Sequence, residues 1–254
     1  MQIDLNGRNA LVTGGTRGIG RAISCTLAGA GARLACIYQS DQATAESTIA
    51  ELNSRWPVES GPHFARQADQ ADGEQIASGV QRCLDQLGGA LDILVLNAAA
   101  STHGALAETP GAEWSRVFDV NVRGAQALLS VACPVIRPGG SIIFISSGAG
   151  HDPIAGLSAY SASKAAVNQM AMVLAQEIGP QGVRVNVVSP GHTEKHAVPA
   201  DSALWSDAQR EAAAASALRR LVTADDVANV VLFFASELSA SVTGQWIRVN
   251  AGRV

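Results

Sequence analysis

The sequence predicts an α/β fold of the Rossmann type: a three-layer αβα sandwich around a central, mostly parallel seven-stranded sheet. Three observations lead to this prediction. Short β-type runs alternate with longer helical stretches along the 254 residues, which is the rhythm of a doubly wound sheet. Several runs are continuously apolar, such as residues 93–96 and 142–145, as expected of strands covered on both faces. A glycine-rich turn follows the first run.

The elements follow in chain order. We expect strands where β-branched and apolar residues cluster, at residues 9–13, 33–38, 63–68, 92–97, 141–146, 183–188 and 246–249. We expect helices in the stretches between them, at residues 18–30, 42–54, 73–87, 112–133, 160–178 and 224–236. Residues 201–218 are predicted to form a helical insertion, because they contain a run of alanine, a strong helix former. No linker divides the chain, so residues 1–254 are predicted to form a single domain.

Composition excludes several classes of function. The formal net charge is -4 with no cluster of Lys or Arg, so no nucleic-acid or membrane partner is expected. No apolar run approaches the roughly 18 residues that span a bilayer. The four cysteines are scattered without a CxxC pair, which favours reduced thiols. The first residues do not resemble a signal peptide, and a cytoplasmic location is the expectation.

The turn after the first strand, residues 13–20, reads TGGTRGIG. Glycines permit a tight turn and a close approach of backbone to ligand. The N-terminus of the following helix carries positive partial charge and suits a pyrophosphate. The spacing differs from the G-x-G-x-x-G fingerprint, and an ordinary glycine-rich strand–helix turn remains the alternative.

Several further motifs occur in a fixed order behind this turn. They are Asn97-Ala98-Ala99, Asn121, Ser147, the Tyr160–Lys164 pair and Ser189-Pro190-Gly191. With them, the chain resembles the single-domain branch of the short-chain dehydrogenase/reductase family, and is similar to its 3-oxoacyl-carrier-protein reductase-like members. The resemblance implies an oxidoreductase that binds a nicotinamide dinucleotide along its glycine turn and at the ends of its strands. The implied cofactor-binding residues are Gly14, Thr16, Arg17, Gly18, Ile19, Gly20, Tyr38, Gln39, Ser40, Asp69, Gln70, Asn97, Ala98, Ala99, Tyr160, Lys164, Pro190, Gly191 and Thr193.

The end of the second strand favours NADP(H) over NAD(H). An acidic residue here grips the ribose 2′-hydroxyl of NAD and repels a 2′-phosphate, and by the family pattern Tyr38 occupies that position. Arg17 is placed to meet a phosphate by charge-assisted hydrogen bonds, and Ser40 adds a hydroxyl. Asp41 is the counter-evidence, but we interpret it as a helix N-cap. Asp69 matches the family position that contacts adenine, with a helix-capping role as the equal alternative.

Tyr160 and Lys164 lie four residues apart on a predicted helix and therefore share one face. An ammonium beside a phenol favours the phenolate, so we expect Lys164 to lower the pKa of Tyr160 and fit it for acid–base work. Ser147 is expected to position the substrate oxygen. Ser146 is the rival serine, but side chains alternate along a strand and we assign it a structural role. The resemblance adds Asn121, which would hold a water on a proton path from Lys164.

The resemblance also implies a substrate side. Residues 192–218 are expected to cover the substrate as a mobile lid, and we expect substrate contacts from His151, Asp152, Ile154 and His192, with His103 as a further candidate. His192 and His196 lie four apart, but no third ligand is evident and no metal is expected. The chain departs from the family pattern at Ala99, Lys195 and Ala251.

The helices at residues 112–133 and 160–178 are apolar over much of their girth, and the family resemblance implies a homotetramer, with a dimer as the alternative. The expected substrate is a small ketone or secondary alcohol, which the sequence does not name. Two other functions remain open: a cofactor-binding protein with a regulatory role, and a non-redox lyase or epimerase on the same fold.

Overall fold

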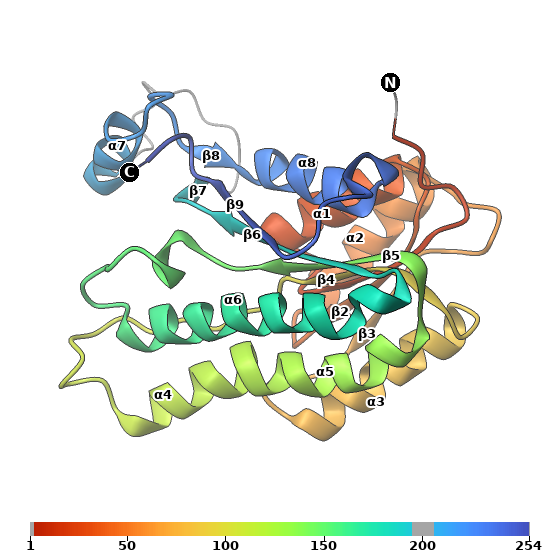
Figure 1. The fold of residues 1–254 in the computed structure, drawn as a ribbon, viewed down its shortest axis with the longest axis horizontal. Helices are drawn as coiled ribbons and strands as arrows, with labels where there is room; N and C mark the ends of the chain where they lie inside the picture. The colour runs from red at the N-terminus through yellow and green to blue at the C-terminus, as the bar shows by residue number, and fades with distance from the viewer. Residues whose placement is uncertain (1–2, 195–205, 254) are drawn as a thin grey trace.

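The computed structural model describes residues 3–194 and 206–253. Seven strands form one sheet in the order β3-β2-β1-β4-β5-β6-β9 (Figure 1), and all six pairings are parallel. The strands are β1 Asn9–Thr13, β2 Arg33–Tyr38, β3 Phe64–Gln67, β4 Leu91–Leu96, β5 Ile136–Ile145, β6 Arg184–Pro190 and β9 Gln245–Val249. The predicted seven-stranded sheet is confirmed.

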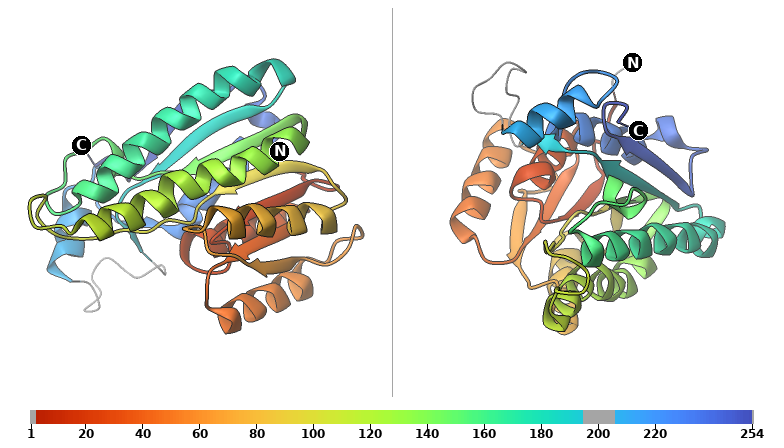
Figure 2. Two further views of the ribbon diagram at one scale, coloured as in Figure 1. Left: turned by 90° about the horizontal axis from the view of Figure 1, so that it is seen from below. Right: turned by 90° about the vertical axis from the view of Figure 1, so that its left-hand side faces the viewer.

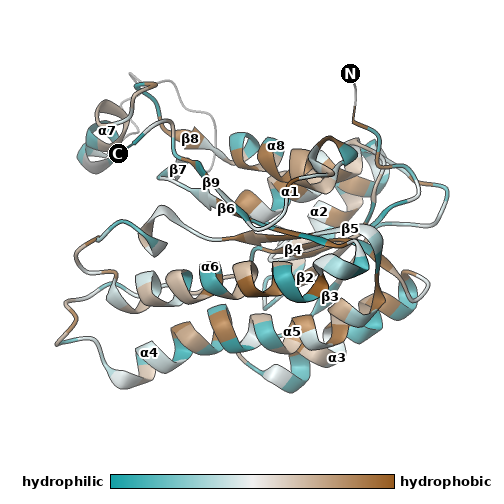
Figure 3. Cartoon of the chain, viewed as in Figure 1, coloured by the Kyte–Doolittle hydropathy of each residue, from teal (hydrophilic) through white to brown (hydrophobic). Residues whose placement is uncertain are grey.

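Helices cover both faces of this sheet, which completes the three layers (Figures 1 and 2). One face carries α1 Gly18–Gly29, α2 Gln42–Arg55 and α8 Ala224–Ala235, and the other carries α3 Gly73–Gln86, α4 Gly111–Phe118, α5 Gly124–Ala132 and α6 Ser158–Ile178. Every residue of β1, β4 and β6 is buried, and the apolar colour concentrates on the strands in Figure 3. Because both faces are covered, β4 and β5 contain continuously apolar runs at residues 93–96 and 142–145, as the sequence indicated.

The topology places the site at the carboxyl ends of the strands. From β1 the chain runs outward to β2 and β3, then returns to the opposite side of β1 as β4. In open parallel sheets the crevice at such a reversal is where ligands bind. The glycine turn after β1 and the loops after β4, β5 and β6 all open at this edge.

The helix predicted at residues 112–133 is interrupted. The π-helical turn Asp119–Arg123 separates α4 from α5, and the 3-10 turn Cys133–Val135 follows α5. The Gln70 side-chain amide donates to the Val120 carbonyl over 2.9 Å, and a side chain that enters the backbone ladder widens a helix in this way. Gly124 permits the contact, because a Cβ there would lie 2.0 Å from the Gln70 carbonyl oxygen.

The predicted insertion at residues 201–218 contains the helix α7 Asp207–Ala214, while residues 195–205 lie outside the described part. A small second sheet pairs β7 Thr193–Glu194 with β8 Val222–Thr223. Strands of two residues have no periodicity, so the sequence did not predict them. The Gln209 side chain donates to Glu194 over 2.9 Å and joins α7 to β7.

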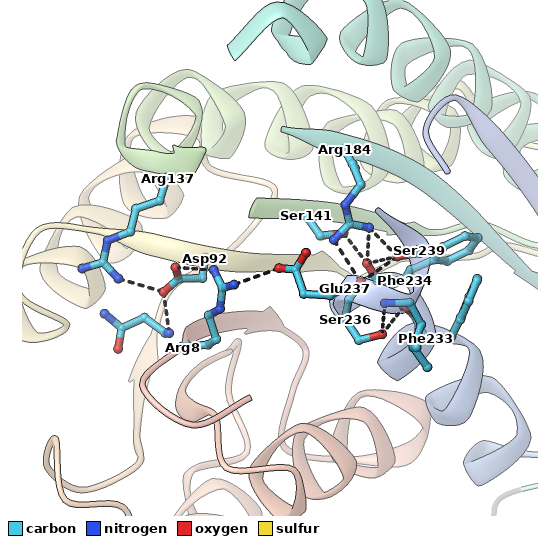
Figure 4. Close-up of polar contacts among 12 residues, drawn as sticks. Arg8, Asp92, Arg137, Ser141, Arg184, Phe233, Phe234, Ser236, Glu237 and Ser239 are labelled. Atoms are coloured by element: carbon cyan, nitrogen blue, oxygen red, sulfur yellow. Dashed lines mark hydrogen bonds and ion pairs between the residues drawn. The ribbon is translucent and has the colours of Figure 1, made fainter. Parts of the chain in front are cut away.

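A buried carboxylate fastens the opposite, amino-terminal edge of the sheet (Figure 4). The Asp92 side chain is 2% exposed and accepts hydrogen bonds from the Arg8 guanidinium at 3.3 Å, the Arg137 guanidinium at 3.0 Å and the Asn9 backbone N–H at 2.8 Å. One side chain therefore ties together the starts of β1, β4 and β5, far from the glycine turn.

We expect Asp92→Ala to lower the free energy of unfolding by about 3 kcal/mol, because three donors lose a charged acceptor and one of them is a buried backbone N–H. Denaturant unfolding measures this loss. Glu237→Ala is the control: its carboxylate also pairs with Arg8 but is 73% exposed, so we expect a loss below about 1 kcal/mol. Equal losses in the two variants would contradict the assignment.

Candidate active site

The glycine turn joins β1 to α1. Gly18 begins α1 with a φ of +53°, a conformation that glycine adopts without strain. Gly20 allows a close approach, because a Cβ there would lie 2.0 Å from the Gly14 carbonyl oxygen. The N-cap residue Arg17 makes no side-chain capping bond, so no side chain of the cap competes with an anion for the first N–H groups of the helix.

This turn borders a cleft of about 1730 Å³. The cleft brings together residues from the turn, the end of β2, the loop after β3 and the loop after β4. Of the sequence-predicted residues it is lined by Gly14, Thr16, Arg17, Gly18, Ile19, Gly20, Tyr38, Gln39, Ser40, Asp69, Gln70, Asn97, Ala98 and Ala99. Ser147, Tyr160, Lys164, Pro190, Gly191 and Thr193 do not line it. The open turn and these walls fit a dinucleotide.

One carboxylate, that of Asp41, follows the end of β2 and borders the cleft. Tyr38 is half-buried, and Gln39 and Ser40 are exposed. Asp41 is the N-cap of α2 and accepts from the Thr44 backbone N–H at 3.0 Å, and this bond and one from the Thr44 hydroxyl lower its pKa. Arg17 is exposed and forms no ion pair within the described residues. The capping role predicted for Asp41 is therefore confirmed, and the Arg17 guanidinium borders the cleft.

In the loop after β3, the helix N-cap is a different aspartate from the one considered from the sequence. Asp72, not Asp69, is the N-cap of α3, so the helix-capping alternative for Asp69 is wrong. Asp69 is half-buried at the cleft and accepts from the Ala71 N–H at 2.9 Å. The Gln70 amide is engaged with the Val120 carbonyl, so its contact with the cleft is that of a supporting residue.

Asn97 fastens the end of β4 to the glycine turn. Its side-chain amide donates to the carbonyls of Thr13 at 2.9 Å and Gly14 at 3.2 Å. The Thr13 hydroxyl in return accepts from the backbone N–H groups of Asn97 and Ala98, both at 3.0 Å. These four bonds fix the two loops on either side of the crevice relative to each other.

Ser147, Tyr160 and Lys164 come together between the end of β5 and the first turns of α6. The Lys164 side chain is buried and its Nζ lies 5.7 Å from the centroid of the Tyr160 ring. Nζ donates to the Ile145 carbonyl over 2.8 Å. The Ser147 hydroxyl accepts from the Ala149 backbone N–H at 3.2 Å, and it lies close enough to the half-buried Tyr160 phenol to lower the pKa of that phenol. The Ser146 hydroxyl lies instead 3.5 Å from the Lys164 carbonyl, in keeping with its structural assignment.

The electrostatics differ from the sequence expectation. Burial raises the pKa of Tyr160, and only the Ser147 hydrogen bond opposes it. Burial also lowers the pKa of Lys164 to about 8. The expected lowering of the Tyr160 pKa by Lys164 is therefore wrong for this arrangement, because desolvation outweighs other effects when both groups are out of water. The residue that favours the phenolate is Ser147.

Asn121 lies in the π-helical turn with its side chain buried. Its amide pairs with both backbone groups of Ala100, accepting at 2.7 Å and donating at 2.9 Å, and donates to the Ser163 hydroxyl at 2.8 Å. The Ser163 hydroxyl donates to the Tyr160 carbonyl at 2.7 Å. Asn121 therefore joins the loop after β4 to α6, and its role on a proton path stays a prediction.

The loop after β6 begins at Pro190, the last residue of the strand. Gly191 is in close contact with Asn250, since a Cβ would lie 2.8 Å from the Asn250 Cβ. The half-buried Thr193 donates its hydroxyl to the Gly191 carbonyl at 2.9 Å, and His192 is exposed. Lys195, His196 and the middle of the predicted lid lie outside the described residues.

The expected substrate residues after Ser147 point in different directions. The His151 ring stacks on the Trp246 ring and bonds to the Asn168 amide, and it borders a separate cavity of about 340 Å³. Asp152 pairs with Arg248 at 3.1 Å, while Ile154 is 45% exposed. His103 is exposed beside Gly156, where a Cβ would lie 2.7 Å from its ring. Substrate contact by these residues stays a prediction.

Two departures from the family pattern have a visible setting. Ala99 is exposed on the cleft and is not among the described residues with positive φ, so the backbone does not require glycine there. Ala251 has a φ of 55°, a left-handed conformation that costs alanine about 1 kcal/mol.

No group of three His, Cys, Asp or Glu in the described ranges is arranged to hold a metal. In the same ranges, no helix has the length and apolarity to cross a membrane.

The sequence missed one group at this site, formed by Asn168 and Trp246 around His151. Residue spacing gave no signal, because Trp246 is distant in sequence and meets His151 only when β9 takes its place beside β6.

Comparisons with known proteins agree with this geometry. Residues 14–253 match the family model described as enoyl-(acyl carrier protein) reductase. An uncharacterized oxidoreductase of Methylorubrum extorquens is 35% identical over 98% of both chains. A 3-oxoacyl-[acyl-carrier-protein] reductase of Staphylococcus aureus is 33% identical, covering 96% of this chain and 97% of its own. The crystal structure of a short chain dehydrogenase from Burkholderia cenocepacia in complex with NADP has a TM-score of 0.88, with 36% identity over 98% of both chains.

The matches run along nearly the whole chain, and the glycine turn and the first turns of α6, with Tyr160 and Lys164, lie at the carboxyl edge of the parallel sheet. The chain belongs to the short-chain dehydrogenase/reductase family of oxidoreductases.

Proposed function

We propose that this chain is an NADP(H)-dependent carbonyl reductase or alcohol dehydrogenase, with Tyr160 as the general acid and base. The meeting of Ser147, Tyr160 and Lys164 carries the proposal, since it puts a phenol, a hydroxyl and an ammonium within one small volume. When bound, the cofactor supplies or takes the hydride.

Each of these side chains has a defined task. The Ser147 hydroxyl donates to the substrate oxygen and holds it toward the phenol. In reduction Tyr160 gives its proton to that oxygen as the alcohol forms, and in oxidation it takes the proton back. Burial of Tyr160 keeps the phenol protonated at neutral pH, which suits it as an acid toward a ketone. The Lys164 Nζ lies 5.7 Å from the centroid of the Tyr160 ring, and by family resemblance this side chain binds the nicotinamide ribose.

A panel of ketones and alcohols, followed by the absorbance of NADPH and NADH, tests this function. We expect turnover of at least one uncharged ketone with NADPH. Product analysis separates the other candidates: binding of NADPH without turnover of any carbonyl would indicate a regulatory protein, and an isomerised product without net cofactor consumption would indicate a lyase or epimerase.

The preference for NADP(H) rests on Arg17 and on the end of β2, where by the family pattern Tyr38 stands at the position of the acidic residue and the Asp41 carboxylate is engaged as the N-cap of α2. The NADP bound by the Burkholderia relative supports it. We expect Arg17→Ala to raise the KM for NADPH by about 10- to 100-fold, the equivalent of one lost charge-assisted hydrogen bond, with little change in the KM for NADH. Steady-state kinetics with both cofactors measures the difference.

Arg21→Ala is the matched control for Arg17→Ala. Arg21 also lines the cleft, but its guanidinium is already paired with Glu51. Arg21→Ala should therefore change the KM for NADPH and the KM for NADH far less than Arg17→Ala does. An equal rise in the KM for NADPH and the KM for NADH in Arg17→Ala would contradict the proposal that Arg17 binds the 2′-phosphate.

We also propose a homotetramer acting on small molecules in the cytoplasm, with residues 192–218 as the lid over the substrate. The outer side of α6 supports an assembly, because Val173 is 46% exposed there. All four cysteines are free, which suits a reducing compartment. Sedimentation equilibrium gives the mass of the assembly and separates a tetramer from a dimer.

A further inference from the structure

We propose that Asn168 and His151 are positioning residues that hold the Ser147 hydroxyl against the Tyr160 phenol. The proposal rests on the function above. It concerns how Ser147 and Tyr160, which lie on different elements, are held at a fixed distance from each other. Ser147 lies in the loop after β5, whereas Tyr160 lies on α6. Something must fix that loop to that helix, since a misplacement of about 1 Å costs about 100-fold in rate.

The loop is seated on α6 by backbone contact. Residues Gly148–Gly150 form a 3-10 turn with Ser147 as its N-cap. Gly150 lies directly on the helix, because a Cβ there would be 3.1 Å from the Lys164 carbonyl carbon and 2.9 Å from the Asn168 amide nitrogen. The turn that begins at Ser147 therefore ends on the turn of α6 between Lys164 and Asn168.

Side-chain contacts of His151 with Asn168 and Trp246 hold the turn against α6, and we call these three residues the clamp. The Asn168 amide nitrogen lies 2.7 Å from Nε2 of His151, and Asn168 is 8% exposed. The plane of the imidazole is stacked on the Trp246 ring of β9. His151 is thus held between α6 and β9, four residues after Ser147.

Burial and the Arg248 charge favour the neutral imidazole, whose Nε2 can accept from the Asn168 amide. The facing charged groups are Asp152 in the same loop and Arg248 on β9, which pair with each other. Burial lowers the pKa of His151 and Arg248 lowers it further, while Asp152 raises it.

The test measures Tyr160 directly. The chain has two tyrosines, so in a Tyr38→Phe background the near-ultraviolet absorbance of phenolate reports Tyr160 alone. Ser147→Ala should raise the pKa of Tyr160, because it removes the hydrogen bond that lowers it. Asn168→Ala should raise that pKa in the same direction, and the double variant should raise it no further than Ser147→Ala does.

Kinetics provides the second readout. We expect Asn168→Ala to lower kcat by about 10- to 100-fold with the KM for NADPH unchanged. His151→Phe keeps a ring on Trp246 but loses the acceptor, and should repeat the effect if Asn168→Ala fails to fold. Asn53→Ala is the matched control, because Asn53 is a helical asparagine that bonds to another histidine, His63, at the far edge of the sheet.

The outcomes separate this proposal from the proposed function. If Asn168→Ala and His151→Phe lower only the melting temperature, as Asn53→Ala should, and leave the Tyr160 titration unmoved, the positioning role is overturned. If the titration moves as expected while the parent reduces no ketone, the positioning role stands and the redox function falls. A pKa rise in the double variant that sums the two single rises would also overturn the role, since Asn168 would then act independently of Ser147.

Discussion

Tyr160→Phe is expected to lower kcat by about 100- to 10,000-fold, the range that one positioned acid–base group contributes. The substitution removes a single oxygen atom and keeps the ring that packs on α6 and beside Lys164. The phenol is half-buried beside Ser147 and Lys164, and of these three groups it is the one proposed to give its proton to the substrate oxygen. Stopped-flow or steady-state reduction with NADPH measures the loss.

Cofactor binding and folding should survive this change. We expect the dissociation constant of NADPH, measured by fluorescence, to change by less than about tenfold, because one neutral hydrogen bond is worth about 1 kcal/mol. Tyr38→Phe removes the only other tyrosine hydroxyl and should affect the cofactor KM more than kcat. A Tyr160→Phe enzyme as fast as its parent would show that the proton comes from elsewhere.

Lys164→Met is the second substitution for which we expect a large effect, and the effect has two opposite parts. Turnover should be nearly lost, because the substitution removes the side chain proposed to bind the nicotinamide ribose beside Tyr160. Stability at neutral pH should rise, because the parent keeps an ammonium group in a buried position. Lys164 is 3% exposed, and its one hydrogen-bond acceptor is the Ile145 carbonyl.

The pH dependence of stability isolates the cost of that buried charge. Burial lowers the pKa of Lys164 from 10.5 to about 8. Between these values the unfolded chain holds a proton that the folded chain has released, so the parent becomes more stable as pH rises from 8 to 10.5 and loses that stability as pH falls from 10.5 to 8. Across this interval the free energy of unfolding of the parent rises by about 3 kcal/mol, at about 1.4 kcal/mol for each pH unit.

Other groups, such as Tyr160, also titrate in this range. Their contribution to stability cancels when Lys164→Met is compared with the parent at each pH. We expect the stability advantage of Lys164→Met over the parent to shrink by about 3 kcal/mol between pH 8 and pH 10.5. Urea unfolding at several pH values gives the curve, with Gln169→Met as an exposed control on the same helix. A constant difference across that interval would show that Lys164 is not charged and buried in the folded state.

The sequence by itself determined the sheet and most of the site. Continuous apolar runs are sufficient to identify strands that both layers of helices cover, and β1 and β2 begin and end at the residues expected. The cleft-lining residues were also recognisable, because glycine-dependent turns and helix caps are local: Gly18 and Asp41 act within a few residues of their own positions.

Only the tertiary structure decided what distant segments do to one another. The π-helical turn around Asn121 depends on Gln70 reaching the Val120 carbonyl, and His151 meets Trp246 only because β9 joins the sheet beside β6. The direction of the Tyr160 pKa belongs to the same class. A spacing of four residues shows that Tyr160 and Lys164 share a helix face, but the desolvation that raises one pKa and lowers the other depends on everything packed around them. Local pattern therefore specified the elements, and long-range packing set their chemistry.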